Sequence, residues 1–111
     1  MLRRSVAAAA AAVGLMLATA TPSHAAIGEF RYTVVDLQNL QVQKELLDPP
    51  SVECINLDIP ASNLPALLGR NLTDSTATLF NEADCDGDTY WVVNPGGRSP
   101  ALARFRSVVF N

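Results

Sequence analysis

The chain has 111 residues with eight basic and eleven acidic side chains, which give a formal net charge of −3. This negative balance argues against nucleic-acid binding and attachment to anionic membranes, because both need a clustered basic surface. The length fits one small domain. A domain of this size commonly needs a covalent staple, because it buries only a modest share of its surface.

The first 25 residues have the pattern of a secretory signal peptide. Two arginines near the start precede an apolar run at 6–20, and the small residues Ser23 and Ala25 follow it. The apolar run is shorter than the ~20 residues that a membrane-spanning helix needs. We therefore predict cleavage after Ala25, secretion, and a single mature β-domain at 26–111.

Removal of this segment would also remove two basic residues and His24, the only histidine of the chain. The mature domain would hold six basic against eleven acidic residues, a net charge of −5. Ser-His-Asp and Cys-His nucleophilic mechanisms and His-ligated zinc sites all need a histidine, so the mature sequence excludes them. We expect a monomeric, non-enzymatic protein without a cofactor, whose partner is another protein and neither nucleic acid nor a membrane.

Cys54 and Cys85 are the only cysteines, and both lie in the mature region. An exported protein matures in an oxidising compartment, where cysteine pairs form disulfides. We therefore predict one disulfide between them. It should stabilise the fold by roughly 2–4 kcal/mol, because it constrains the unfolded chain.

The first part of the mature region predicts a hairpin. Residues 29–35 alternate between apolar and polar side chains, which is the pattern of a half-buried strand. Residues 36–48 fit neither the strand nor the helix period cleanly. We predict a second strand centred on 40–44 and joined to the first by a turn at 36–39, with a short helix as the alternative. The inward face of the first strand would carry Phe30, Tyr32 and Val34.

The middle of the chain is less regular. Residues 52–57 resume as a strand, which should lie beside the acidic turn that follows, because Cys54 must reach Cys85. A proline at position 65 and Gly69 fit the start and stop signals of a helix, so one helical turn is predicted at 65–68.

The last third of the chain reads as three strands, at 76–80, 89–93 and 105–110. An acidic turn with a glycine separates the first two, and a Pro-Gly-Gly turn follows the second. The whole pattern predicts an all-β fold, a small antiparallel sandwich or barrel of five to six strands with one disulfide. The predicted core consists of Phe30, Tyr32, Val34, Leu40, Val42, Cys54, Ile55, Leu57, Leu67, Leu79, Phe80, Trp91, Val93, Phe105 and Val109.

The stretch 80–87 reads Phe-Asn-Glu-Ala-Asp-Cys-Asp-Gly, and Ser107 follows twenty residues after its glycine. This pattern resembles the βγ-crystallin Greek-key motif. In that family an aromatic residue begins a folded hairpin, a second aromatic comes five positions later, and a glycine follows two positions after that. A serine from the last strand then hydrogen-bonds the backbone of the hairpin. Phe80, Gly87 and Ser107 match this motif, whereas Cys85 stands where the second aromatic belongs.

The resemblance covers residues 76–110 and implies a Greek-key fold, in which 29–57 would form a degenerate first motif. Small secreted bacterial proteins of this kind include protease inhibitors, so the implied function is a secreted, non-enzymatic binding module that inhibits a protease. Two alternatives stay open: a calcium-binding structural or envelope protein, and a secreted domain with no small-molecule site.

The calcium alternative depends on the carboxylates of the acidic turn. Glu82, Asp84 and Asp86 alternate ahead of a glycine, as the ligands of calcium-binding loops do. Position 12 of an EF-hand loop would however be Val93, where a bidentate glutamate is needed. A solvated acidic turn is therefore the competing interpretation. A glycosidase-like carboxylate pair would need a substrate cleft, for which so small a domain has little room.

Two loops are candidates for contact with a partner. The loop at 59–65 carries Pro60, Leu64 and Pro65, and its prolines would stiffen it, which lowers the entropic cost of binding. The loop at 94–100 offers Arg98 as an anchor. In the alternative interpretation both are plain connections between strands.

Overall fold

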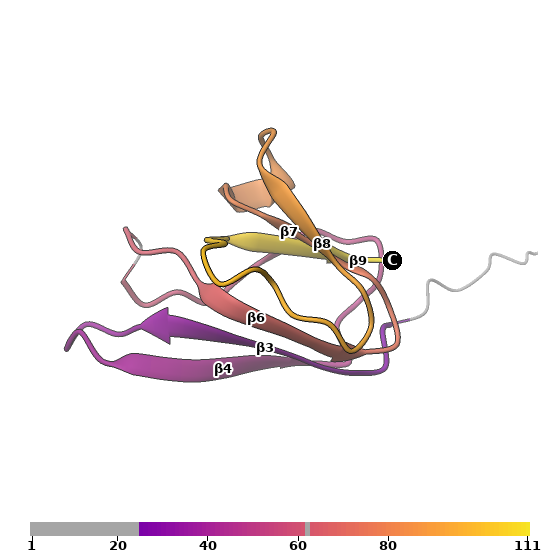
Figure 1. Ribbon diagram of the computed structural model, residues 1–111, viewed down its shortest axis with the longest axis horizontal. Coiled ribbons are helices and arrows are strands. Elements are labelled where there is room, and N and C mark those ends of the chain that lie inside the picture. The colour runs from indigo at the N-terminus through magenta and orange to yellow at the C-terminus, as the bar shows by residue number, and fades with distance from the viewer. Residues whose placement is uncertain (1–24, 62) are drawn as a thin grey trace, which may run out of the picture.

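Two antiparallel β-sheets lie face to face in the computed structural model, which describes residues 25–61 and 63–111 (Figure 1). The predicted signal peptide falls, except for Ala25, outside the described residues. Within the described part of the chain, no helix is long and apolar enough to cross a membrane.

The first sheet is the lower layer in Figure 1 and has the strand order β4-β3-β6. The β3–β4 hairpin closes through Asp36, whose carboxylate accepts hydrogen bonds from the backbone N–H groups of Gln38 and Leu40, both at 2.9 Å. The predicted second strand is therefore confirmed and is longer than expected, and the helical alternative is wrong. The strands are β3 (Gly28–Val35), β4 (Gln41–Leu47) and β6 (Leu67–Thr73).

The helical turn predicted at 65–68 is wrong, because strand β6 begins within this segment. The strand pattern was hidden because the inward positions of β6 are Gly69, Asn71 and Thr73, which are small or polar, while leucines occupy outward positions. Apolar alternation marks a strand only where the buried side chains are apolar.

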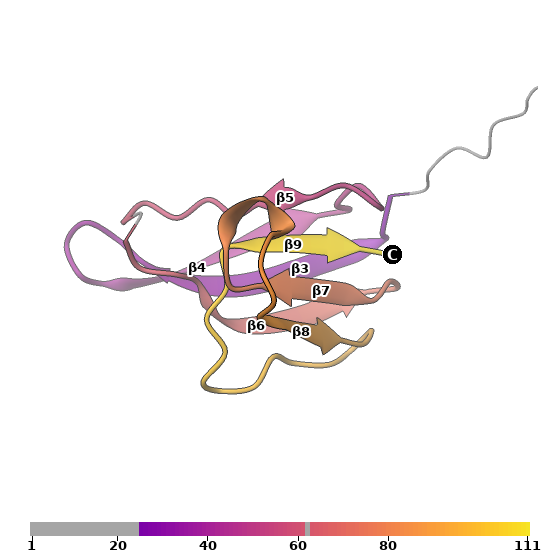
Figure 2. The ribbon, with the colours of Figure 1, turned by 90° about the horizontal axis from the view of Figure 1, so that it is seen from above.

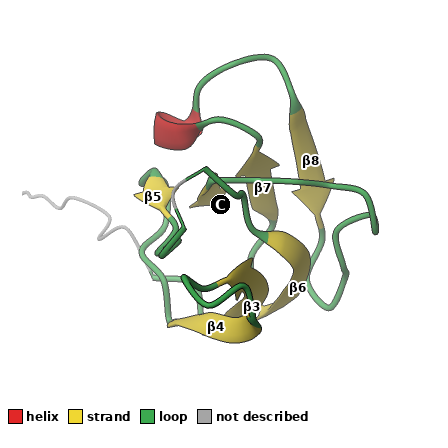
Figure 3. Ribbon diagram, turned by 90° about the vertical axis from the view of Figure 1, so that its left-hand side faces the viewer, coloured by secondary structure: helices red, strands yellow, loops and turns green. Residues whose placement is uncertain are grey.

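The second sheet has the order β5-β9-β7-β8 and covers the first, as the view from above in Figure 2 shows. Every strand predicted in the last third of the chain is present, and the strand predicted at 52–57 is reduced to two residues. A short 3-10 turn, η1 (Ala83–Cys85), follows β7 and is seen from the end of the sandwich in Figure 3. The strands are β5 (Ile55–Asn56), β7 (Ala77–Phe80), β8 (Tyr90–Val93) and β9 (Ser107–Phe110).

The connections between the sheets follow the same path in both halves of the chain. After the β3–β4 hairpin, the chain crosses to the second sheet as β5 and returns to place β6 beside β3. After β7 and β8 it crosses to the first sheet, where Arg98 pairs with Arg70 of β6, and returns to place β9 beside β7. In a Greek key, three consecutive strands are followed by a fourth that lies beside the first. Both halves of the chain follow this path, and in each half the third segment lies in the opposite sheet. The predicted all-β Greek-key sandwich is thus confirmed, with seven strands among the described residues instead of five to six.

An aromatic cluster fills the space between the sheets. The ring of Phe30 lies 5.7 Å from that of Phe110 and 6.3 Å from that of Phe105, both edge to face, and 6.1 Å from that of Tyr32. Such pairs contribute beyond their buried area. Fully buried members of the core include Phe30, Tyr32, Val34, Leu79, Phe105, Val108 and Phe110.

Three predicted core residues are placed differently. Leu40 is exposed, because it belongs to the turn at 36–40, and Cys54 is exposed, because it precedes the short strand β5. Val109 is only half-buried, and its neighbour Val108 is buried instead. Phe105 pairs with Ala66, just before β6, in an isolated bridge outside strand β9, so the alternation of buried residues in β9 does not continue from Phe105. Half-buried members of the predicted set are Val42, Ile55, Leu67, Phe80 and Trp91.

Candidate functional site

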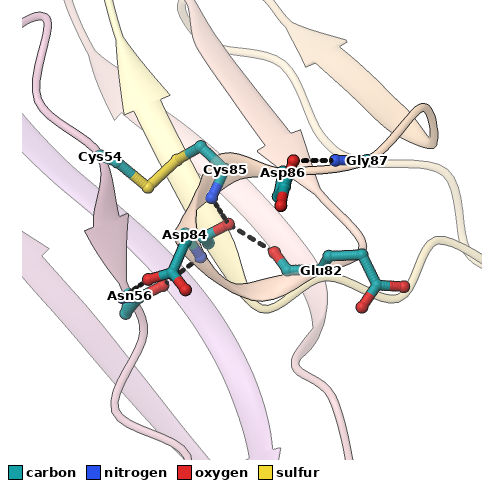
Figure 4. The surroundings of a disulfide bond; sticks show 8 residues. Cys54, Asn56, Glu82, Asp84, Cys85, Asp86 and Gly87 are labelled. Carbon is teal, nitrogen blue, oxygen red and sulfur yellow. Dashed lines mark hydrogen bonds between the residues drawn. A yellow bond between two sulfur atoms is a disulfide. The ribbon is translucent and has the colours of Figure 1, made fainter.

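The hairpin between β7 and β8 is stapled to the rest of the domain. The predicted disulfide between Cys54 and Cys85 is present, with a Cα–Cα distance of 5.8 Å (Figure 4). It joins the segment that enters β5 to the 3-10 turn η1. The disulfide therefore links two segments that are 31 positions apart in sequence at one edge of the second sheet.

Ser107 of β9 forms hydrogen bonds with the backbone of the same hairpin. Its hydroxyl is fully buried, accepts a hydrogen bond from the backbone N–H of Cys85 at 2.8 Å, and donates one to the carbonyl of Glu82 at 2.6 Å. This is the contact that the βγ-crystallin resemblance implies for a serine at this position. Gly87 has a φ of +84°, which glycine adopts without steric cost.

A side-chain pair adds a third attachment. Asn56 of β5 donates from its amide nitrogen to the Asp84 carboxylate at 2.9 Å, and its amide oxygen accepts from the Asp84 backbone N–H at 2.7 Å. Figure 4 shows the two side chains facing each other beside the disulfide. Asp84 and Cys85 both have positive φ, 61° and 53°, which costs energy for residues with a Cβ. The disulfide, Ser107 and Asn56 together hold this strained backbone in place.

Replacement of Ser107 by alanine is expected to destabilise the domain by roughly 1–3 kcal/mol, because two part-buried backbone groups lose their hydrogen-bond partner. Chemical denaturation of the oxidised protein measures this loss. Ser51→Ala is the matched control, since Ser51 makes no side-chain hydrogen bond within the described chain and should unfold at the wild-type midpoint. Equal midpoints for Ser107→Ala and wild type would contradict the role given to this hydroxyl.

The acidic residues of the hairpin do not converge on one point. Asp84 faces Asn56, the Asp86 carboxylate accepts the N–H of Gly87 at 2.9 Å, and the Glu82 side chain extends away from both (Figure 4). Among the residues that the structure describes, no group of three or more His, Cys, Asp or Glu side chains is arranged to hold a metal ion. Calcium binding at Glu82, Asp84 and Asp86 stays a prediction that this geometry does not favour.

The loop at 59–65 is anchored on both sides. Just before it, the backbone N–H of Asp58 donates to the Tyr32 hydroxyl at 3.3 Å, and the Asp58 carboxylate accepts from Lys44 at 2.8 Å. Just after it, Ala66 and Phe105 exchange two backbone hydrogen bonds at 2.8 and 3.0 Å.

Burial raises the pKa of Tyr32, and the hydrogen bond to Asp58 raises the pKa of Lys44. The hydroxyl and the ammonium group therefore keep their protons and their contacts at neutral pH.

Within this loop, the backbone N–H of Leu64 donates to the carbonyl of Ala61 at 2.8 Å, and Ile59 packs against the core. Pro60 is exposed and Pro65 is half-buried, so both prolines lie where they restrict the loop without disturbing a strand. The loop is thus short and held by hydrogen bonds at both of its ends, which lowers the entropic cost of binding a partner.

Three exposed leucines define what we call the apolar end: Leu37, Leu40 and Leu64, with exposed fractions of 77%, 62% and 37%. The turn at 36–40 and the loop at 59–65 lie at the same end of the sandwich, opposite the C-terminus (Figures 1 and 2). The sequence did not indicate Leu37 as a surface site, and Leu40 was predicted to lie in the core. An exposed apolar residue in a turn cannot be told from a buried one by its residue type alone.

The other candidate loop, 94–100, does not protrude in the same way. Asn71 donates its N–H to the carbonyl of Gly97 and accepts from the N–H of Gly96, and the N–H of Ser99 donates to the carbonyl of Gly69. The segment is therefore attached along β6, and Arg98 lies opposite Arg70. This position brings Arg98 to the outer face of the first sheet and away from a free loop tip.

The fold and its stapled hairpin define a disulfide-closed, all-β Greek-key domain with two hydrogen-bonded loops that position surface side chains. Comparison of the chain with models of protein families, with curated proteins and with solved structures finds no match.

Proposed function

We propose that the chain is a secreted, non-enzymatic binding module of the βγ-crystallin-like kind, and that it inhibits a protease through its apolar end. The observation that carries the proposal is the apolar end itself: Leu37, Leu40 and Leu64 are exposed on two turns at the same end of the sandwich. Groups of exposed large apolar side chains are typical of protein contact sites.

The rigidity of the scaffold supports inhibition as the mode of action. A loop whose ends are already fixed in the free protein loses less entropy on binding, and hydrogen bonds at Asp58 and Ala66 fix the two ends of the 59–65 loop. A protease also acts on flexible segments first, so a loop fixed at both sides resists cleavage while it occupies an active-site cleft.

The crystallin-like resemblance is supported by the hydrogen bonds of Ser107 and by the positive φ of Gly87, which are the backbone features that the motif requires. Secretion is supported by the disulfide, since such bonds persist in oxidising compartments. Ala26, the first residue after the predicted cleavage position, is buried and donates its backbone N–H to the carbonyl of Pro49 at 2.8 Å.

The proposal is tested by incubating the oxidised protein with a panel of secreted metallo- and serine proteases and measuring residual activity. We expect at least one protease to lose activity at stoichiometric inhibitor. The double variant Leu37→Asp/Leu64→Asp should abolish this inhibition, because it places two charges in the contact surface.

Leu47→Asp is the matched control. Leu47 has an exposed fraction of 67%, between those of Leu37 and Leu64, but it is the last residue of β4 and lies away from the turn at 36–40. Inhibition should survive this change. Full activity of every protease at excess inhibitor would refute inhibition, and equal inhibition by the double variant would refute the apolar end as its site.

A further inference from the structure

Three arginines line up across the outer face of the first sheet. Arg31 of β3 lies opposite Arg70 of β6, and Arg70 lies opposite Arg98 of the crossing segment. Like charges on directly opposed positions of neighbouring strands repel each other and destabilise a sheet. Half of the six basic residues of an acidic domain are thus gathered at one place, where they oppose folding.

The acidic groups near this row compensate for only part of its charge. Glu29 forms an ion pair with Arg31, and Glu45 of β4 is the register partner of Arg31 on the other side. Within the described chain, Arg70 and Arg98 have no carboxylate at ion-pair distance. Two guanidinium groups therefore retain their charge and their hydrogen-bonding capacity for another partner.

A cavity of about 270 Å³ opens beside these arginines. It forms where the β3–β6 register shifts: Arg31 pairs with Arg70 but Thr33 pairs with Leu67, so Leu68 and Gly69 together oppose a single residue of β3. Such an extra residue is a β-bulge, and Leu68 adopts a φ of +54° to form it. Bulges of this kind recur next to binding sites, where they redirect side chains and interrupt the ladder of backbone hydrogen bonds.

Two buried hydroxyl groups face the same cavity. Thr33 is only 9% exposed and lines the cavity, and its hydroxyl makes no hydrogen bond to any other described residue. Ser99, at 8% exposure, accepts the N–H of Gly69 at 2.8 Å, which leaves its own hydroxyl proton free to donate. Both hydroxyl groups can therefore donate a hydrogen bond to a ligand that accepts one within the cavity.

From the arginine row, the bulge and the two hydroxyls, we infer that this cavity binds a small oxyanion: a carboxylate, sulfate or phosphate group. Guanidinium groups bind such groups through paired, charge-assisted hydrogen bonds, and hydroxyl donors complete the shell of the anion. The cavity is close to the lower end of the size range of small-molecule sites. It uses Arg31, Arg70 and Arg98 and is independent of the apolar end.

The test is an NMR titration of the oxidised, ¹⁵N-labelled protein with sodium sulfate, sodium phosphate and sodium citrate, at an ionic strength held constant with sodium chloride. Amide shifts are the readout, since sulfate and phosphate also raise melting temperatures without binding. We expect at least one anion to shift the amides of Leu68, Gly69, Arg70, Arg98 and Ser99 saturably. The comparison of the three salts separates a planar carboxylate from a tetrahedral anion as the preferred ligand.

Variants separate a built site from a general charge effect. Arg70→Gln and Arg98→Gln should each weaken binding by more than about tenfold. Thr33→Val should weaken it without any change of net charge, and Arg104→Gln, which removes one positive charge outside the cavity, should leave it unchanged. The inference is overturned if no anion gives saturable shifts at these amides, or if Arg104→Gln weakens binding as much as Arg70→Gln.

Discussion

Loss of the Cys54–Cys85 disulfide is expected to lower the free energy of unfolding by about 3 kcal/mol, because the unfolded chain regains the freedom of the closed loop. For a domain of this size, that corresponds to a fall in Tm of roughly 12–24 °C. The hairpin should lose order first, since Asp84 and Cys85 then keep their positive φ with only the Ser107 and Asn56 contacts to hold them.

Thermal unfolding of the Cys54→Ala/Cys85→Ala variant, followed by circular dichroism, measures this effect. The reductant-treated wild type should melt at the same temperature as the variant, and reductant should leave the variant unchanged. A variant that melts within two or three degrees of the oxidised wild type would show that the staple adds little and that the hairpin is held by its other contacts.

The second large effect is expected at Asn71, which is fully buried in β6. Its amide nitrogen donates to the carbonyls of Ser75 at 2.7 Å and Val93 at 3.0 Å, and its amide oxygen accepts from the backbone N–H and the hydroxyl of Thr73. Every hydrogen-bonding group of this amide is therefore used, and the contact with Val93 ties the first sheet to the second. Asn71→Leu keeps the volume but orphans these partners, at a cost of roughly 3–4 kcal/mol.

Urea denaturation of Asn71→Leu measures this cost, with Asn94→Leu as the matched control. Asn94 is exposed, and its side chain makes no hydrogen bond to another described residue. We expect the control to unfold within about 0.5 kcal/mol of wild type. Wild-type stability of Asn71→Leu would contradict the view that a polar side chain, and not only the aromatic cluster, holds the two sheets together.

Local signals explain why so much of the fold could be predicted from the sequence. The alternation of Phe30, Tyr32 and Val34 fixed the face of β3, and the pairing of Cys54 with Cys85 followed from there being only two cysteines in a chain with an export signal. The turn between β7 and β8 could also be predicted, because it contains Gly87, which adopts the positive φ that this tight turn needs.

Strand β6, the arginine row and the apolar end could not be predicted, because they depend on contacts between residues that are distant in the sequence. β6 was missed because its buried positions are Gly69, Asn71 and Thr73, which are small or polar and whose polar groups are satisfied by a mixture of local contacts and tertiary contacts to Ser99 and Val93. The arginine row is a product of strand order: Arg31, Arg70 and Arg98 are separated by 39 and 28 positions and meet only through pairing across the sheet. Leu64 was predicted as part of a partner-binding loop, but its place at the same end of the sandwich as the turn at 36–40 was missed for the same reason, since nothing in the sequence indicates it.

We propose that a protease binds at the apolar end of this disulfide-stapled sandwich. Hydrogen–deuterium exchange of the protein, alone and bound to a protease that it inhibits, tests this most directly. We expect protection to increase at residues 36–40 and 59–66 and to stay unchanged in the hairpin at 81–88. Protection that appears in the acidic hairpin, or on any other face while both turns exchange as in the free protein, would contradict it.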